Sequence, residues 1–208
     1  MGKVLIVDDH PVVRMAVRML LEKHGLSVTG ETDNGVDAVQ MAKELRPDII
    51  ILDISIPRLD GFEVISRLKL SGLPIHILVL TSQSANFFSA RCMQAGASGF
   101  VCKEEKLAEL LNAVKAIQAG YTYFPAQFIK SVRGKEVHMD EHERITRLSD
   151  RELMVLEQLA RGLTNKQIAE SMLLSNKTIS TYKTRLHEKL NTGNLVELIE
   201  LAKRNALV

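Results

Sequence analysis

Short apolar runs alternate with amphipathic segments over residues 1–124. The runs are KVLIVD, SVTGET, DIIILD, IHILVLT and SGFVCK, and all except SVTGET are nearly continuously apolar. Such runs are typical of parallel strands that are covered on both faces. After the last run, apolar residues recur at the helical spacing i, i+3, i+4, i+7, namely Leu107, Leu110, Leu111, Val114 and Ile117. Five strand–helix units of this kind predict an α/β domain with a doubly wound, five-stranded parallel sheet.

The pattern changes after residue 124. Residues 125–147 are charged and aperiodic, which favours a linker between two domains. From residue 148 onward the apolar spacing is helical throughout, with Gly162 placed to end the first helix. Four helix starts are marked by capping residues or by a new apolar pattern: Ser149 with Glu152, Thr164 with Gln167, Ser175, and the segment 195–205. The sequence therefore predicts an all-α four-helix domain over 148–208.

Composition adds little to this picture. Hydrophobic residues make up 46% of the chain, as in ordinary globular proteins, and the net charge of +2 points to no partner by itself. The two cysteines, Cys92 and Cys102, lack metal-binding spacing, which favours a reduced cytoplasmic protein without disulfides. No signal-peptide pattern opens the chain, and no apolar run approaches the roughly 20 residues that span a bilayer.

Four of the five expected strands end in polar side chains. Asp8 and Asp9 follow the first strand, Asp53 the third, Thr81 the fourth and Lys103 the fifth. Parallel strands meet the same sheet edge with their carboxyl ends. A strand order of 2-1-3-4-5 makes strands 1 and 3 neighbours at the switch point, where such sheets bind ligands. Three converging carboxylates can share one hard cation, and Mg²⁺ prefers oxygen ligands.

Each of these residues has a simpler explanation when taken alone. An Asp after a strand often caps the following helix, a single Lys usually lies at the surface, and a Thr after a strand usually belongs to a turn. The combined pattern favours a site, because the strand order would bring all five side chains to one place.

The segments VLIVDDHP, PDIIILDISIPRLDG, LVLTS and AGASGFVCK resemble the receiver domain of two-component response regulators, across residues 1–124. The resemblance implies a flavodoxin-like fold and phosphoryl transfer from a sensor histidine kinase to Asp53. It also implies a bound Mg²⁺, held by Asp9, Asp53 and the main-chain carbonyl of Ser55, with Asp8 acting through water. Lys103 would neutralise charge during the transfer, as the chemistry of an attacking carboxylate requires.

The same resemblance assigns a conformational switch to Thr81 and Phe100. A phosphoryl group on Asp53 would draw the Thr81 hydroxyl toward it, and the Phe100 ring would enter the space left behind. Ser55 and Gln83 occupy positions that tune self-dephosphorylation in the family.

The segment LSDRELMVLEQLARGLTNKQIAESMLLSNKTISTYKTRLHEKL resembles the LuxR-type helix-turn-helix of NarL/FixJ regulators, from Leu148 to the end of the chain. Its second half, together with GYTYFP, is most similar to the branch that contains BvgA and EvgA. The resemblance implies binding to double-stranded DNA, a homodimer formed on phosphorylation, RNA polymerase as a further partner, and a multidomain phosphorelay kinase as the phosphoryl donor.

The helix expected at 175–190 has an apolar stripe formed by Ile179, Tyr182, Leu186 and Leu190. Four cations (Lys177, Lys183, Arg185 and Lys189) and one anion (Glu188) give this helix a charge of 4 − 1 = +3. A solvated helix face would explain such a charge, but the helix-turn-helix signature favours a recognition helix. We expect phosphate contacts from Lys166, Lys177, Lys183 and Arg185, and base contacts from Ser180, Thr181 and Thr184. Val196 and Ile199 pack either across a dimer axis or in the core.

Two other functions are compatible with parts of this pattern. Aspartate-nucleophile phosphatases typically carry a D-x-D motif after strand 1, whereas here the strand-1 pair is adjacent and a solitary Asp53 follows strand 3. A DNA-binding protein with a receiver that is not phosphorylated would not need the complete acidic set. We therefore expect a phosphorylation-controlled transcription regulator that is not an enzyme, apart from its own phosphotransfer and slow autodephosphorylation.

Overall fold

The computed structural model describes residues 2–105, 107–125 and 139–208. The chain divides into two compact units, Met1–Phe128 and Ile129–Val208. No helix in the described part of the chain is both long enough and apolar enough to cross a membrane.

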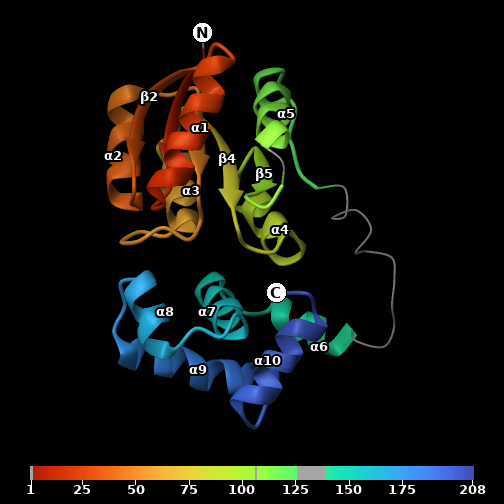
Figure 1. Ribbon diagram of the computed structural model, residues 1–208. Coiled ribbons are helices and arrows are strands. Elements are labelled where there is room, and N and C mark those ends of the chain that lie inside the picture. The colour runs from red at the N-terminus through yellow and green to blue at the C-terminus, as the bar shows by residue number, and fades with distance from the viewer. Residues whose placement is uncertain (1, 106, 126–138) are drawn as a thin grey trace. The chain divides into compact units, whose positions relative to one another are not determined.

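The first unit is a five-stranded parallel sheet with helices on both faces (Figure 1). Its strands are β1 (Lys3–Val7), β2 (Ser27–Thr32), β3 (Ile49–Leu52), β4 (His76–Thr81) and β5 (Gly99–Cys102). Its helices are α1 (Pro11–Lys23), α2 (Gly35–Leu45), α3 (Gly61–Leu70), α4 (Ala85–Ala95) and α5 (Leu107–Gln118). The strand order β2-β1-β3-β4-β5 confirms the predicted doubly wound topology.

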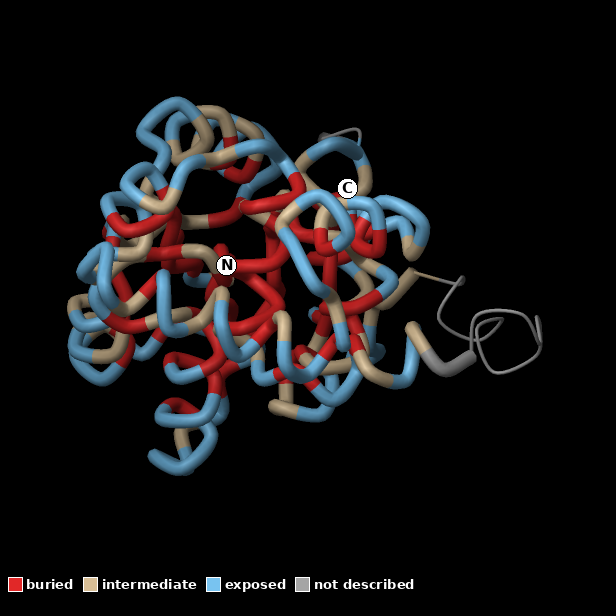
Figure 2. Tube along the Cα trace, turned by 90° about the horizontal axis from the view of Figure 1, so that it is seen from below, coloured by how far each residue is buried: buried red, intermediate tan, exposed pale blue. Residues whose placement is uncertain are grey.

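Burial on both faces explains why the strand sequences are so apolar. All residues of β3 and all but the first residue of β1 and β4 are buried, and Figure 2 colours buried residues red. Alternate strand residues point to opposite faces, and those on one face pack against α1 and α5. This cluster includes Val4, Ile6, Ile49, Ile51, Leu78, Val17, Leu21, Leu110, Val114 and Ile117. Of the predicted stripe of the last helix, Leu110, Leu111, Val114 and Ile117 are thus part of the core, and the side chain of Leu107 lies outside the described part of the chain.

The sheet is extended beyond α5 by a single bridge at its β5 edge. Tyr123 pairs with Gly99 in parallel orientation. The Tyr123 N–H donates to the carbonyl of Ser98 (3.0 Å), and the Tyr123 carbonyl accepts from the N–H of Phe100 (2.7 Å). The segment around Tyr123, at the end of the predicted first domain, is therefore hydrogen-bonded to the edge of the sheet.

The second unit consists of helices in its described part. They are α6 (Met139–Thr146), α7 (Asp150–Ala160), α8 (Asn165–Ser171), α9 (Asn176–Leu190) and α10 (Leu195–Arg204). Both predicted capping boxes are present, at Ser149 with Glu152 and at Thr164 with Gln167, and the Ser175 side chain accepts from the N–H of Thr178. Helix α7 packs against α8, α9 and α10.

Helix α6 corrects the predicted linker and adds a fifth helix to the four expected. Residues 126–138 of that linker lie outside the described residues, but its end forms α6. Ile145 is buried, Arg144 Nη1 donates to the carbonyl of Leu190 at the end of α9 (3.1 Å), and Arg204 Nη2 lies 3.1 Å from Glu141 Oε1. These contacts with distant helices stabilise α6. Its own sequence has too few apolar residues to show a helical period.

Candidate functional site

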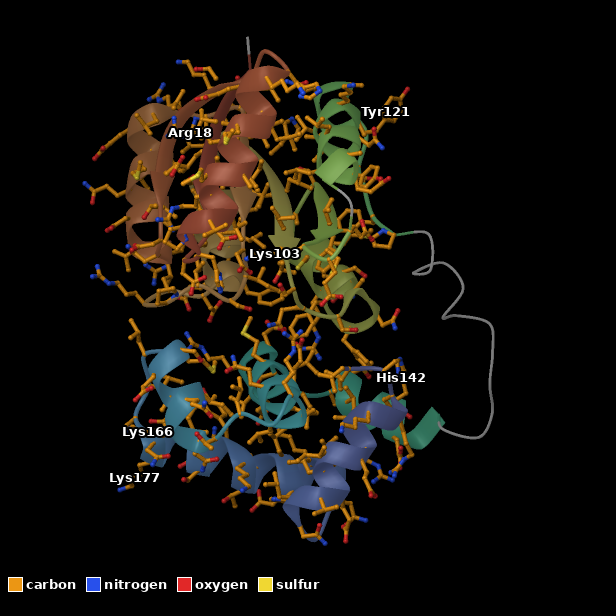
Figure 3. All side chains as sticks on the ribbon, viewed as in Figure 1. Arg18, Lys103, Tyr121, His142, Lys166 and Lys177 are labelled. Atoms are coloured by element: carbon orange, nitrogen blue, oxygen red, sulfur yellow. The ribbon has the colours of Figure 1, made fainter. Side chains whose placement is uncertain are left out.

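The polar residues that follow β1, β3, β4 and β5 meet at one edge of the sheet. Lys103 Nζ lies 2.6 Å from Asp53 Oδ2 and 2.7 Å from Asp8 Oδ2. Figure 3 labels Lys103 at the carboxyl end of the sheet. One ammonium group therefore joins the carboxylates that follow two neighbouring strands, as the predicted strand order requires.

Asp53 is held through both of its carboxylate oxygens. While Oδ2 faces Lys103, Oδ1 accepts from Thr81 Oγ1 (2.8 Å) and from the N–H of Ser55 (3.0 Å). The Asp53 residue is only 3% exposed. Gln83 Nε2 donates to Ser55 Oγ (2.8 Å), which links the loops after β3 and β4. These bonds fix the orientation of the Asp53 side chain.

The loop after Asp53 is fixed by a close approach to α3. The N–H of Gly61 donates to the carbonyl of Ile54 (3.1 Å). A Cβ atom on Gly61 would lie 2.5 Å from the Cα of Ile54, so only glycine allows this approach. Asp60 caps α3 by accepting from the N–H of Glu63.

Asp9 lies at the outer side of the site. Its side chain is 32% exposed, and its Oδ1 lies 2.8 Å from His10 Nδ1. Burial raises the pKa of Asp9, and the charges of Asp53 and Asp8 raise it further, while His10 opposes this. Burial alone would lower the pKa of Lys103, but the Asp53 and Asp8 carboxylates outweigh it and the pKa is raised.

The donor set fits a divalent cation. Ligand atoms of Asp8, Asp9, His10 and Asp53 lie within 4.8 Å of one another. A cation would relieve the mutual repulsion of the three carboxylates. Two residues at this site were not predicted from the sequence. His10 directly follows the Asp8–Asp9 pair, and Arg14 Nη1 donates to the Asp8 carbonyl (2.5 Å), which connects the acidic turn to α1.

Of the two residues of the expected switch, Thr81 contacts Asp53, and Phe100 lies on the neighbouring strand β5, paired with Val79 of β4. Thr81 bonds Asp53 as described above, and Phe100 on β5 is 1% exposed. The switch assigned to these two residues stays a prediction.

In the second unit, α9 has the predicted two faces. Ile179, Leu186 and Leu190 are buried, whereas Tyr182 is only half-buried, contrary to the full stripe expected. Tyr182 lines a shallow surface hollow with Ser175, Lys177, Thr178, Thr181 and Arg185. Its ring therefore contributes to the outer surface as well as to packing.

The polar face of α9 is accessible. Exposed side chains on it are Lys177, Ser180, Thr181, Thr184 and Arg185, and Lys183 is half-buried. Figure 3 shows Lys166 on α8 and Lys177 at the start of α9 projecting outward. Lys189 points elsewhere, because its Nζ lies 2.7 Å from the buried Glu152 Oε2. The helix thus offers fewer free cations than its sequence charge indicates.

Comparison with known proteins accounts for both units. Residues 4–115 match the family model described as response regulator receiver domain, and residues 146–202 match bacterial regulatory proteins, luxR family. The chain is a response regulator of the NarL/FixJ family. The chain is therefore a transcription regulator with a receiver domain and a LuxR-type DNA-binding domain.

Relatives of the regulator match it along nearly its whole length. BvgA of Bordetella pertussis, a positive transcription regulator of virulence factors, is 57% identical over 206 residues, which are 99% of each chain. The DNA-binding transcriptional activator EvgA of Escherichia coli K12 is 36% identical over 206 residues, 98% of each chain. RcsB from Salmonella enterica serovar Typhimurium, bound to promoter rprA in the presence of phosphomimetic BeF₃⁻, matches with a TM-score of 0.66 and 27% identity. This match covers 98% of the regulator and 99% of the RcsB chain.

We expect Glu152→Gln to loosen the attachment of α9 to α7 in a pH-dependent way. Burial raises the pKa of Glu152, but bonds from Lys189 and Ser149 outweigh it and the pKa is lowered. The stabilisation is therefore present above the unfolded-state pKa and is lost as pH falls through the folded-state value. At neutral pH the free energy of unfolding of the variant should be lower by about 1–3 kcal/mol, and the difference should shrink as pH falls below 4.5, the ordinary pKa of a glutamate.

Amide hydrogen exchange of α9 across a pH series measures this effect. Glu188→Gln, which removes an exposed carboxylate from α9 itself, is the matched control and should leave exchange unchanged. Equal exchange in wild type and Glu152→Gln at neutral pH would contradict the prediction.

Proposed function

We propose that Asp53 accepts a phosphoryl group from a sensor histidine kinase and that this modification controls dimerisation and DNA binding. The observation that carries the proposal is the environment of Asp53. It is a buried carboxylate at the switch point of the sheet, with the Lys103 ammonium and the Thr81 hydroxyl both in direct contact. A carboxylate of purely structural function would not need both donors beside an open acidic turn.

In the proposed transfer, an oxygen of Asp53 attacks the phosphorus of a phosphohistidine. The O–P bond forms as the P–N bond breaks, and the electron pair of the broken bond stays on the leaving imidazole. Lys103 offsets negative charge at the attacking carboxylate and at the transferring oxygens. The N–H of Ser55 keeps the side chain of Asp53 oriented.

A divalent cation, Mg²⁺ in the simplest case, would be held by Asp9, Asp53 and the main-chain carbonyl of Ser55, with Asp8 acting through water. When bound, the ion would offset charge on the three carboxylates and on the incoming phosphoryl group. Slow autodephosphorylation would follow from water attack on the acyl phosphate, next to Ser55 and Gln83.

The phosphoryl group on Asp53 would stabilise one of two conformations of the receiver domain. Thr81 would bond a phosphoryl oxygen on Asp53, and Phe100 would pack behind it; the Thr81–Asp53 bond and the burial of Phe100 support this proposal. The state with both residues inward would then be favoured over the alternative. We assign the receiver to 1–124, the linker to 125–138 and the DNA-binding domain to 139–208, because α6 packs within the second unit.

In the DNA-binding domain, α9 would enter the major groove. Lys166, Lys177, Lys183 and Arg185 would contact phosphates, and Ser180, Thr181 and Thr184 would approach base edges. Two domains joined in a homodimer would bind paired half-sites with higher affinity than one alone. We propose RNA polymerase and a multidomain phosphorelay kinase as further partners. We propose the cytoplasm as the location of the regulator.

Sedimentation and DNA footprinting of the full chain, with and without beryllofluoride, test this function. We expect the phosphoryl mimic to shift the regulator from monomer to dimer and to produce protected, paired half-sites on genomic DNA. A monomer with the same DNA affinity in both conditions would contradict the proposed control.

We expect Thr181→Ala and Lys183→Ala to weaken DNA binding in different ways. Thr181 is exposed on the face opposite to Ile179 and Leu186, and its hydroxyl already donates to the carbonyl of Lys177 (3.1 Å). The lone pairs of that oxygen remain available to a base-edge donor. Thr181→Ala should weaken the specific site by about 1–3 kcal/mol and random DNA much less.

Lys183 is half-buried at the flank of α9, and its long stem can bring the ammonium to the DNA backbone. Lys183→Ala should weaken specific and random DNA similarly and reduce the salt slope by about one unit. Binding isotherms on both DNAs across a salt series measure this. If Lys183→Ala lost only specific binding while Thr181→Ala lost neither, the assigned orientation of α9 would be wrong.

A further inference from the structure

We infer that the imidazole of His10 is a ligand of the divalent-ion site, so that this site prefers first-row transition ions of the Fe²⁺ to Zn²⁺ range over Mg²⁺. The inference rests on the proposed function, which places a cation among Asp8, Asp9 and Asp53. It adds a nitrogen ligand to a set that otherwise consists of oxygens.

The distance between His10 and Asp9 fits neighbouring positions on one ion. His10 Nδ1 lies 2.8 Å from Asp9 Oδ1 and 3.1 Å from Asp8 Oδ1. An octahedral ion with bonds of roughly 2.1 Å separates its neighbouring ligands by about 3.0 Å. The His10–Asp9 separation is close to this value, the Asp8 contact is a hydrogen bond, and the Asp53 ligand atom belongs to the same group within 4.8 Å.

The turn also orients the imidazole toward the site. The N–H of His10 donates to Asp8 Oδ1 (2.9 Å), which holds this oxygen next to the ring. Asp8 Oδ2 faces Lys103 instead, so the two oxygens of one buried carboxylate are divided between Lys103 and His10. The His10 side chain is 65% exposed, so the ring is accessible to an ion that arrives from solvent.

The chemistry of the ligands then decides the class of ion. Mg²⁺ is a hard cation that takes oxygen ligands and gains little from an imidazole. Iron, nickel, copper and zinc ions bind imidazole well, and affinity for a mixed nitrogen–oxygen site rises along the first-row series to copper. A site in which one imidazole joins these oxygen ligands therefore favours these ions, whereas the oxygen ligands alone do not distinguish them as strongly.

Calorimetric titration of the untagged full chain with NiCl₂ and with MgCl₂ tests the inference. His10→Ala should lower the Ni²⁺ affinity about tenfold or more and change the Mg²⁺ affinity by less than about threefold. His24→Ala is the matched control, because His24 is an exposed histidine at the other end of α1. His24→Ala should leave both affinities unchanged, and Asp9→Ala should lower the affinity for both ions.

A second measurement keeps the inference testable if His10→Ala alters the local fold. Addition of Co²⁺ to the wild-type chain should shift an imidazole ring proton of His10 far outside the diamagnetic range in the NMR spectrum, through direct coordination. Unchanged Ni²⁺ affinity in His10→Ala, equal losses of both ions, or no shifted His10 resonance would each overturn the inference. If Mg²⁺ binds and Asp53 is phosphorylated in these cases, the proposed function stands; if neither occurs, it fails as well.

Discussion

Asp53→Asn should reduce labelling by acetyl phosphate in Mg²⁺ to background. The amide has nearly the shape of the carboxylate but lacks the nucleophilic charge that must attack phosphorus. Its oxygen can still accept from Thr81 and from the N–H of Ser55, so the loop after β3 should keep its conformation. The loss of labelling should therefore occur without loss of the fold.

Intact-mass spectrometry followed by mapping of the phosphorylated peptide measures this result. Asp33→Asn removes an exposed carboxylate from the loop after β2 and serves as the matched control, with labelling equal to wild type. A thermal unfolding scan of each variant separates chemistry from stability. Phosphate mapped to another residue of the wild-type chain would refute the assignment of Asp53.

Removal of the divalent cation should have an effect of similar size. Asp9 is the carboxylate of the three that has no contact with Lys103 in the structure, so it depends most on another cation for charge balance. Without an ion, three carboxylates repel an incoming phosphoryl donor. Excess chelator should therefore stop labelling, and Asp9→Ala should lower it nearly to the same level.

Initial rates of labelling over a range of Mg²⁺ concentrations measure this dependence. Asp33→Ala removes a carboxylate outside the acidic turn and should follow the wild-type curve. Full labelling of the wild type in excess chelator would refute the requirement for a metal. Asp9→Ala with an unchanged Mg²⁺ dependence would remove Asp9 from the set of ligands.

Much of the fold was predictable because local patterns carry it. The nearly continuous apolar runs at β1, β3, β4 and β5 follow from burial on both faces of a parallel sheet. The strand order then brings Asp8, Asp53 and Lys103 together, because parallel strands end at one edge. The capping boxes at Ser149 and Thr164 were readable for a similar reason, since each is formed within four consecutive residues.

Other features depend on contacts between distant segments. Lys189 counts as a free cation in the sequence, yet it pairs with Glu152 on another helix, and Tyr182 is only half-buried although it follows the apolar spacing. Helix α6 is stabilised by Glu141 and Arg144 through partners 46 to 63 residues away. Periodicity reports only local neighbours, so no local pattern could show these contacts.

The sequence by itself determined the parallel sheet and the set of side chains at its edge, and the resemblance to receiver domains implied the strand order. Only the tertiary structure decided which hydrogen bonds and ion pairs each of these side chains forms. Lys103 joins Asp8 to Asp53, whereas His10 turns back over Asp8 and Asp9. Strand order places residues at an edge, but the direction of each side chain follows from the packing and charge of all its neighbours at once.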